Sequence, residues 1–189
     1  MYTTQSMNIN QVKTATKIGD FVIRQNHRNK IKVVFLSQIT KEELRDSIPR
    51  VYLFTVDGII KKIGGSAGKG GIKSTINLYT SAMTGSPGVP RFVCHLLIER
   101  SLMNGSKVEL FMITSPKVKA PVTGLFTHRE EYIASFKEME GYCKEDYFGL
   151  EKKYPDWNFQ ENNEDYPVEF AKLHNLYHHT RLKNKKQTI

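Results

Sequence analysis

The stretch VYLFTVDGIIKKIGG, residues 51–65, decides the fold that the sequence predicts. Two runs rich in β-branched and aromatic residues flank Asp57-Gly58, a pair that tolerates positive φ in a two-residue turn. The stretch therefore predicts a β-hairpin. Apolar and polar residues also alternate over 107–114 (KVELFMIT), which predicts a third strand beside the hairpin.

Helical patterns surround these strands. Apolar residues recur at helical spacing over 72–83 and 91–103, and capping boxes at Thr40 and Thr127 predict two further helix starts, the second helix continuing to about residue 153. The run at 31–36 (IKVVFL) predicts one more strand, and a last helix is expected beyond Tyr166. The predicted fold class is α/β, more closely α+β, with a small three-stranded antiparallel sheet flanked by helices.

Composition limits the class of protein. The chain has 189 residues and a net charge of +9, and its 39% apolar content is enough for a core, which excludes a disordered polyelectrolyte. We expect a cytoplasmic protein without a membrane span, because no run approaches about 18 apolar residues and the N-terminus lacks a signal-peptide core. Two cysteines, Cys94 and Cys143, exclude a disulfide framework and a four-thiolate zinc site.

The charge is unevenly distributed along the chain. Residues 1–83 carry 13 basic and 5 acidic side chains, whereas residues 127–169 carry 5 basic and 12 acidic ones. A basic body with one acidic stretch suits a protein that binds a polyanion such as DNA and needs a few carboxylates in one place. The glycine-rich loop at 64–71 lacks the Gly-Lys-Ser/Thr spacing of a P-loop, so no nucleotide cofactor is expected.

A set of motif residues appears in a definite order. Tyr52 lies in the first hairpin strand, and KIG, residues 62–64, lies in the second. Lys73 lies at the start of the next helix, Glu145 lies on a later helix, and PDWN follows at residues 155–158. This order resembles the GIY-YIG nuclease superfamily over roughly residues 50–158. It is most similar to the short type II restriction enzymes of that family, among which a lysine is tolerated in place of the second tyrosine.

The resemblance implies a catalytic set of Tyr52, Lys62, Lys73 and Glu145. Tyr52 would act as the general base, and Glu145 would hold a single Mg²⁺, with Mn²⁺ as a substitute; Mg²⁺ keeps several waters, so one carboxylate ligand is chemically sufficient. Lys73 takes the place of the family's usual arginine, although lysine cannot donate bidentately to a phosphate.

Alternatives remain open for two of these positions. Arg91, four residues before His95 in the following helix, could supply the arginine instead of Lys73, and Glu138 or Glu140 could bind the metal instead of Glu145. Supporting roles fall to residues near these positions, and three basic residues are expected to contact DNA. The supporting residues are Asn77, Arg91, His95 and Asn158, and the DNA-contacting residues are Lys61, Lys69 and Arg91.

The chain is divided by this resemblance into three parts. Residues 1–49 are expected to form an N-terminal arm, strand and short helix with DNA and dimer contacts, the first 30 residues or so being an arm or a loosely packed helix. Residues 50–158 form the GIY-YIG-like catalytic domain, and residues 159–189 form a C-terminal helix and basic tail.

The predicted function is that of a Mg²⁺-dependent, sequence-specific endonuclease of double-stranded DNA, like a type II restriction enzyme of bacterial or phage origin. One core has one active site, so cutting both strands favours a homodimer. Two alternatives stay open: a phage or mobile-element GIY-YIG enzyme that nicks DNA, and a non-catalytic DNA-binding module of the same fold.

Overall fold

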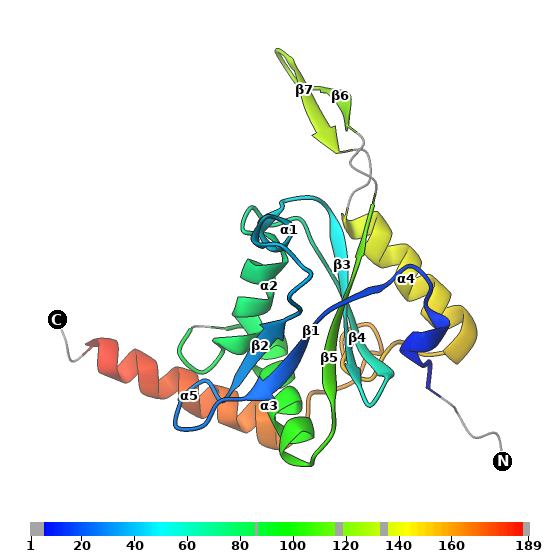
Figure 1. Ribbon diagram of the computed structural model, residues 1–189. Coiled ribbons are helices and arrows are strands. Elements are labelled where there is room, and N and C mark those ends of the chain that lie inside the picture. Colours follow the sequence, from blue (N-terminus) through cyan, green and yellow to red (C-terminus); the bar gives the residue numbers. More distant parts are fainter. Residues whose placement is uncertain (1–5, 86, 116–118, 133–135, 187–189) are drawn as a thin grey trace.

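A five-stranded antiparallel sheet with the strand order β2-β1-β5-β3-β4 forms the centre of the computed structural model, which describes residues 6–85, 87–115, 119–132 and 136–186. Helices α2 and α3 cover one face of this sheet and α4 covers the other, as Figure 1 shows. The strands are β1 (Thr16–Ile23), β2 (Ile31–Phe35), β3 (Arg50–Val56), β4 (Ile59–Ser66) and β5 (Val108–Thr114). The helices are η1 (Ile9–Gln11), α1 (Lys41–Arg45), α2 (Gly71–Thr80), α3 (Val89–Met103), α4 (Phe136–Glu151) and α5 (Val168–Lys186).

The predicted hairpin is confirmed as β3 and β4. Asp57 and Gly58 form its turn with φ values of 49° and 80°, the positive values that such a turn requires. The Asp57 side chain also accepts a hydrogen bond from the backbone N–H of Lys107 at 2.8 Å, which ties the turn to the start of β5. β5 pairs with β3 along its whole length, so the predicted third strand is confirmed as well.

The prediction of a three-stranded sheet is wrong. β1 pairs with both β5 and β2, so the segment expected to be an arm or a loose helix is an inner strand of the sheet. A register shift between Lys17 and Gly19 brings the neighbouring residues Ile18 and Gly19 into the buried region together. This bulge breaks the alternation by which a strand is recognised in a sequence. The sheet thus crosses the predicted boundary at residue 50, while the division into domains stays a prediction.

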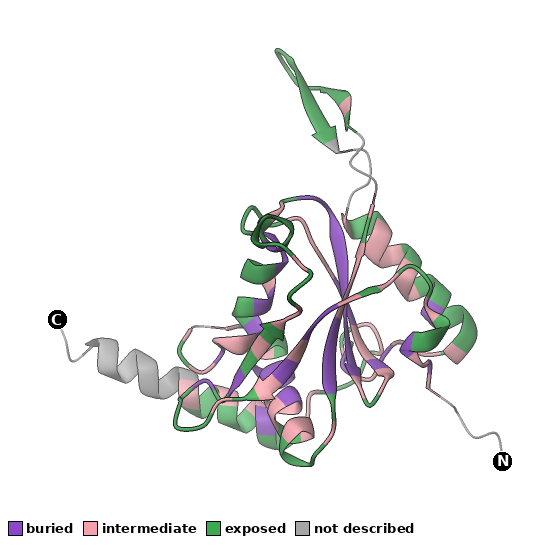
Figure 2. Cartoon of the chain, in the orientation of Figure 1, coloured by how far each residue is buried: buried purple, intermediate pink, exposed green. Residues whose placement is uncertain are grey.

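Two apolar clusters lie on the two faces of the sheet. The cluster under α2 and α3 contains Tyr52, Phe54, Tyr79 and Trp157, whereas the cluster under α4 contains Leu53 and its neighbours. Successive residues of β3 point to opposite faces, so Tyr52 and Leu53 belong to different clusters. The central strands are accordingly buried on both sides (Figure 2).

A second hairpin stands apart from this body (Figure 1). Its strands are β6 (Lys119–Thr123) and β7 (His128–Tyr132), which pair with each other, and the tip residues Leu125 and Phe126 are each 94% exposed. The helix predicted to start at the Thr127 capping box is therefore wrong over residues 128–132. By contrast, the capping box at Thr40 is confirmed at the start of α1.

Among the described residues, none of the helices combines the length and the apolar character that are needed to span a membrane.

Candidate active site

Two tyrosines meet beneath α2 at the centre of the candidate site. The hydroxyl oxygens of Tyr52, on β3, and Tyr79, on α2, are 2.7 Å apart, and both side chains are buried. Burial raises the pKa of Tyr52 well above its ordinary value, and burial does the same to Tyr79. Both phenols are therefore protonated at neutral pH in the free protein.

Two glycines of β4 let functional side chains approach this strand closely. Gly64 pairs with Tyr52, and a Cβ atom at Gly64 would lie 2.4 Å from the Tyr52 hydroxyl oxygen. A Cβ atom at Gly65 would lie 2.4 Å from Oε2 of Glu140, which comes from α4. The glycines after Ile63 thus allow a tyrosine and a carboxylate to converge on β4 from opposite faces of the sheet.

Two basic side chains lie on the side of the sheet that carries the tyrosine pair. Lys62 lies on the same face of β4 as Gly64, two residues away, and its ammonium group is 3.4 Å from the carbonyl oxygen of Trp157. Arg91, in the first turn of α3, is exposed, and its charge lowers the pKa of both Tyr52 and Tyr79, against the larger effect of burial. Arg91 is therefore the basic residue whose charge reaches the tyrosine pair.

Glu140 is the carboxylate that faces this region. Its charge contributes to raising the pKa of Tyr52, after burial, and the carboxylate is half-buried. Lys144, one turn further along α4, pairs with Oε1 of Glu140 at 2.6 Å and also with Glu161. Oε1 is thus engaged by a lysine, while Oε2 lies over the backbone of Gly65.

Asn158 braces the edge strand next to these groups. Its side-chain oxygen accepts a hydrogen bond from the N–H of Ile63 at 2.9 Å, and its amide nitrogen donates to the carbonyl oxygen of Ile63 at 3.0 Å. The same amide donates to Glu161 at 3.1 Å. Asn158 therefore pairs with an edge strand as a neighbouring strand would, and links it to Lys144 through Glu161.

Replacing Asn158 by Ala is expected to destabilise the fold by about 2 to 3 kcal/mol, because two buried backbone groups of Ile63 lose their partners. Denaturant unfolding measures this change, and Gln160→Ala, at an exposed position two residues away, is the control. Equal midpoints for the two variants would contradict the bracing role.

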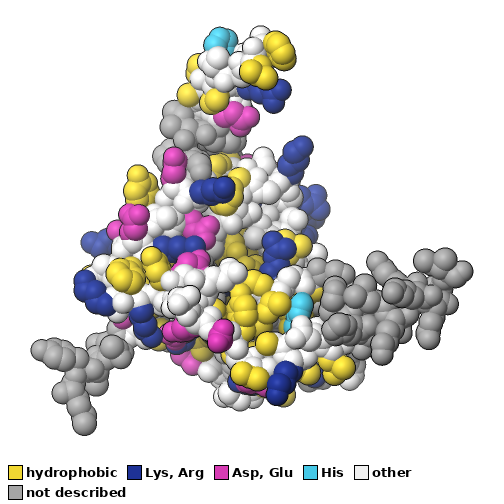
Figure 3. All heavy atoms as spheres, turned by 180° about the vertical axis from the view of Figure 1, so that it is seen from behind, with side chains coloured by type: hydrophobic (Ala, Val, Ile, Leu, Met, Phe, Trp, Pro, Cys, Tyr) yellow, Lys and Arg dark blue, Asp and Glu magenta, His cyan; other side chains and the backbone are white. Residues whose placement is uncertain are grey.

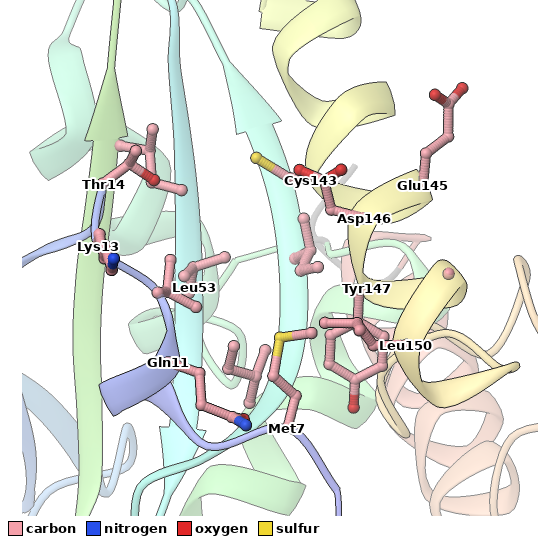
Figure 4. Close-up of a pocket in the computed structure, with 15 residues that line it drawn as sticks. Met7, Gln11, Lys13, Thr14, Leu53, Cys143, Glu145, Asp146, Tyr147 and Leu150 are labelled. Carbon is pink, nitrogen blue, oxygen red and sulfur yellow. The ribbon is translucent and has the colours of Figure 1, made fainter.

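The glutamate expected from the sequence lies elsewhere. Glu145 lies on the same helix as Glu140, but it is exposed and lies at a pocket of about 650 Å³ lined by Met7, Leu53 and Tyr147. Figure 4 shows its carboxylate directed away from the strands. Glu138 is also exposed on α4.

The remaining candidates divide between the site and its surroundings. Lys73 and Asn77 are exposed on α2 and line a separate groove together with Lys69. His95 is fully buried, and its Nδ1 is 2.8 Å from the carbonyl oxygen of Tyr79, so it joins α3 to α2. Lys61 forms an ion pair of 2.7 Å with Asp156.

Tyr79 and Lys144 are members of this site that the sequence did not indicate. Tyr79 is one of several apolar residues at helical spacing in α2, and a core position explains it equally well. The signal for Glu140 was present: it falls on the stripe formed by Phe136, Cys143 and Tyr147, which faces the sheet. A carboxylate within an apolar stripe indicates a polar partner beneath the helix.

Comparisons with known proteins support the fold. No family model matches the chain, and no curated protein matches it. Among solved structures, restriction endonuclease HPY188I in complex with product DNA is similar, with a TM-score of 0.50, 16% identity, and coverage of 80% of this chain and 85% of that chain. A mutant of bacteriophage T4 EndoII also has a TM-score of 0.50, with 18% identity and coverage of 80% and 98%. The chain therefore shares the fold of these two structures.

Proposed function

We propose that this chain is an endonuclease that hydrolyses phosphodiester bonds in double-stranded DNA, with one Mg²⁺ at the active site. The observation that carries the proposal is the Tyr52–Tyr79 pair beside Gly64, on which the charges of Arg91 and Glu140 act, with Lys62 on the same face of β4. Support also comes from the fold, which the chain shares with a restriction endonuclease whose structure contains product DNA. The GIY-YIG family assignment, sequence specificity and homodimer formation belong to the same proposal.

The donor set fits a metal that keeps most of its waters. Within the described residues, no group of three or more His, Cys, Asp or Glu side chains could hold a metal ion. Mg²⁺ commonly binds through one or two carboxylates and retains water, so Glu140 Oε2 is a sufficient protein ligand. The bound ion would polarise the phosphate and stabilise charge on the leaving oxygen.

Four side chains of the protein supply the other functions of the site. Arg91 and Lys62 neutralise charge that develops on the phosphate, and Arg91 can do so through two parallel N–H donors. Tyr52 accepts the proton of the attacking water as its phenolate, which the positive charge of Arg91 favours. Lys144 holds the other oxygen of Glu140 and so orients the carboxylate.

The rate of DNA cleavage is expected to increase as the pH rises. Because burial raises the pKa of Tyr52, the phenolate is a minor form below pH 9, and its fraction increases about tenfold per pH unit. Single-turnover rates between pH 6.5 and 9 would measure how steeply the cleavage rate rises with pH. The residual cleavage rate of Tyr52→Phe should not show this rise. A wild-type rate independent of pH would mean that Tyr52 acts in its protonated form.

The proposed activity is tested by incubating purified protein with supercoiled plasmid and phage genomic DNA, in Mg²⁺ and in EDTA. Discrete fragments in Mg²⁺ that disappear in EDTA and in Tyr52→Phe would support a sequence-specific nuclease. Open-circular plasmid without linear product would instead indicate nicking.

A non-catalytic DNA-binding module is the second candidate function. The burial of Tyr52, a residue that is only 5% exposed, is the observation that favours it, because a catalytic base must reach its substrate. DNA that is shifted on a gel yet stays intact under all metal conditions would establish this alternative.

A further inference from the structure

A groove lined by five basic residues lies beside α2, on the flank away from β4. It has a volume of about 590 Å³, and its basic residues come from separate elements: Arg24 follows β1, Lys32 lies in β2, Arg45 ends α1, Lys69 precedes α2, and Lys73 lies in its first turn. We call these five residues and the space between them the basic groove. Four of the five side chains are exposed, and Arg24 is half-exposed.

No carboxylate lines the basic groove among the residues that the structure describes. Nor does any ion pair in that part of the chain involve one of its five cations, whereas Lys17, Lys61, Lys107 and Lys144 elsewhere each contact an acidic side chain. A cleft lined by charges of one sign concentrates the field and attracts the opposite charge. The basic groove is therefore built to receive an anion rather than to balance the protein's own charges.

The surface view agrees with this asymmetry. Seen from behind, acidic and basic side chains are mixed on the side where α4 lies, while the upper part of the opposite side, where α1 and α2 lie, shows basic side chains (Figure 3). The positive charge on that side is thus not offset by neighbouring carboxylates on the visible face.

The shape of the basic groove suits an extended ligand. Ser74, Asn77 and Thr80 lie along one edge at intervals of three residues, a row of about 9 Å at 1.5 Å per residue. One strand of duplex DNA carries a phosphate every 3.4 Å along the axis, so this row spans two or three phosphates. Hydroxyl and amide groups of this kind commonly contact phosphate oxygens.

α2 connects the basic groove to the candidate active site. The helix carries Tyr79 to Tyr52 on one flank and presents Lys73 and Asn77 to the basic groove on another. The basic groove and the Tyr52–Tyr79 pair both lie on the face of the sheet that α2 and α3 cover. One duplex laid across α2 can therefore reach both.

We propose that the basic groove binds the sugar-phosphate backbone of the same DNA duplex, a few base pairs from the bond that is cut. This proposal rests on the proposed function, because it assumes that DNA occupies the site at Tyr52. Contacts of this kind carry no base information and set the affinity and register of the duplex. They also make binding dependent on salt.

The test is the salt dependence of binding. Fluorescence anisotropy of a labelled duplex in EDTA would compare wild type with Lys69→Ala/Lys73→Ala and with the control Lys137→Ala/Lys152→Ala, two exposed lysines of α4 and its C-terminal end. Removing two phosphate contacts is expected to lower the slope of log Kd against log salt by about 1.8, and to weaken binding about tenfold or more near 0.1 M salt. The control should keep the wild-type slope.

The outcomes separate this proposal from the proposed function. A groove variant that binds with the wild-type slope and Kd would overturn the proposal, even if plasmid DNA is cleaved. A reduced slope in the groove variant, in a protein that never cleaves DNA, would support DNA binding by the basic groove and contradict the proposed nuclease activity. A duplex RNA of equal length, or vesicles containing anionic lipid, serves as a competing ligand: groove-dependent binding of either one without groove-dependent binding of DNA would also overturn the proposal.

Discussion

Replacing Glu140 by Gln is expected to reduce cleavage about a thousandfold without weakening DNA binding. The change keeps the size of the side chain and removes the charge that would hold Mg²⁺, and charge stabilisation by a bound metal is worth several kcal/mol, at about 1.4 kcal/mol per factor of ten. Single-turnover cleavage with saturating enzyme measures the loss, and anisotropy in EDTA measures the affinity.

The same experiment on Glu145→Gln distinguishes the two glutamates. Glu140 and Glu145 are five residues apart on α4, which places them about 140° apart around the helix, so both cannot face β4. Loss of cleavage in Glu145→Gln with full activity in Glu140→Gln would reject the assignment made from the geometry and restore the one expected from the sequence. Glu164→Gln, at an exposed position after the helix, controls for the change in charge.

Local signals predicted those parts of the fold that local chemistry determines. The turn at Asp57-Gly58 and the capping box at Thr40 each depend on residues within four positions of one another, and both formed as predicted. The capping box at Thr127 did not form a helix. The residues after it, HREEY, offer no apolar stripe to pack against the body, and they pair with β6 instead.

Strand β1 could not be recognised because its inward-facing residues do not alternate. The bulge between Lys17 and Gly19 shifts the pattern by one residue, and the partner strand β5 begins nearly 90 residues later. Pairing at that separation depends on the whole chain, which no local window contains. The count of three strands follows from this omission.

Part of the candidate site depends on local pattern and part on the packing of helices against the sheet. Tyr52 and Lys62 follow from the hairpin register, because the pair Tyr52–Gly64 fixes which side chains share a face. The arginine and the carboxylate depend on how α3 and α4 are rotated against the sheet, which packing decides. The sequence left Arg91 and Glu140 as alternatives, and the structure brings these two toward Tyr52.

Replacing Arg91 by Ala is expected to lower kcat about a hundredfold or more. Its guanidinium charge lowers the pKa of Tyr52 and Tyr79, so removing it disfavours the phenolate and also takes away a charged donor for the phosphate. Steady-state cleavage of a short duplex measures kcat and KM separately. Arg129→Ala, an exposed arginine of β7, is the control.

The effect of Arg91→Ala should be compared with that of Lys73→Ala, because Lys73 is the residue that the sequence placed in the arginine's role. Lys73 lies in the basic groove, so its loss should raise KM and reduce the salt dependence of binding, while loss of Arg91 should act mainly on kcat. Arg91→Lys keeps the charge and loses the bidentate donor, and is expected to recover only part of the rate. If Lys73→Ala lowers kcat as far as Arg91→Ala does, then α2 must move toward the phosphate when DNA binds, and the two basic positions act in one site.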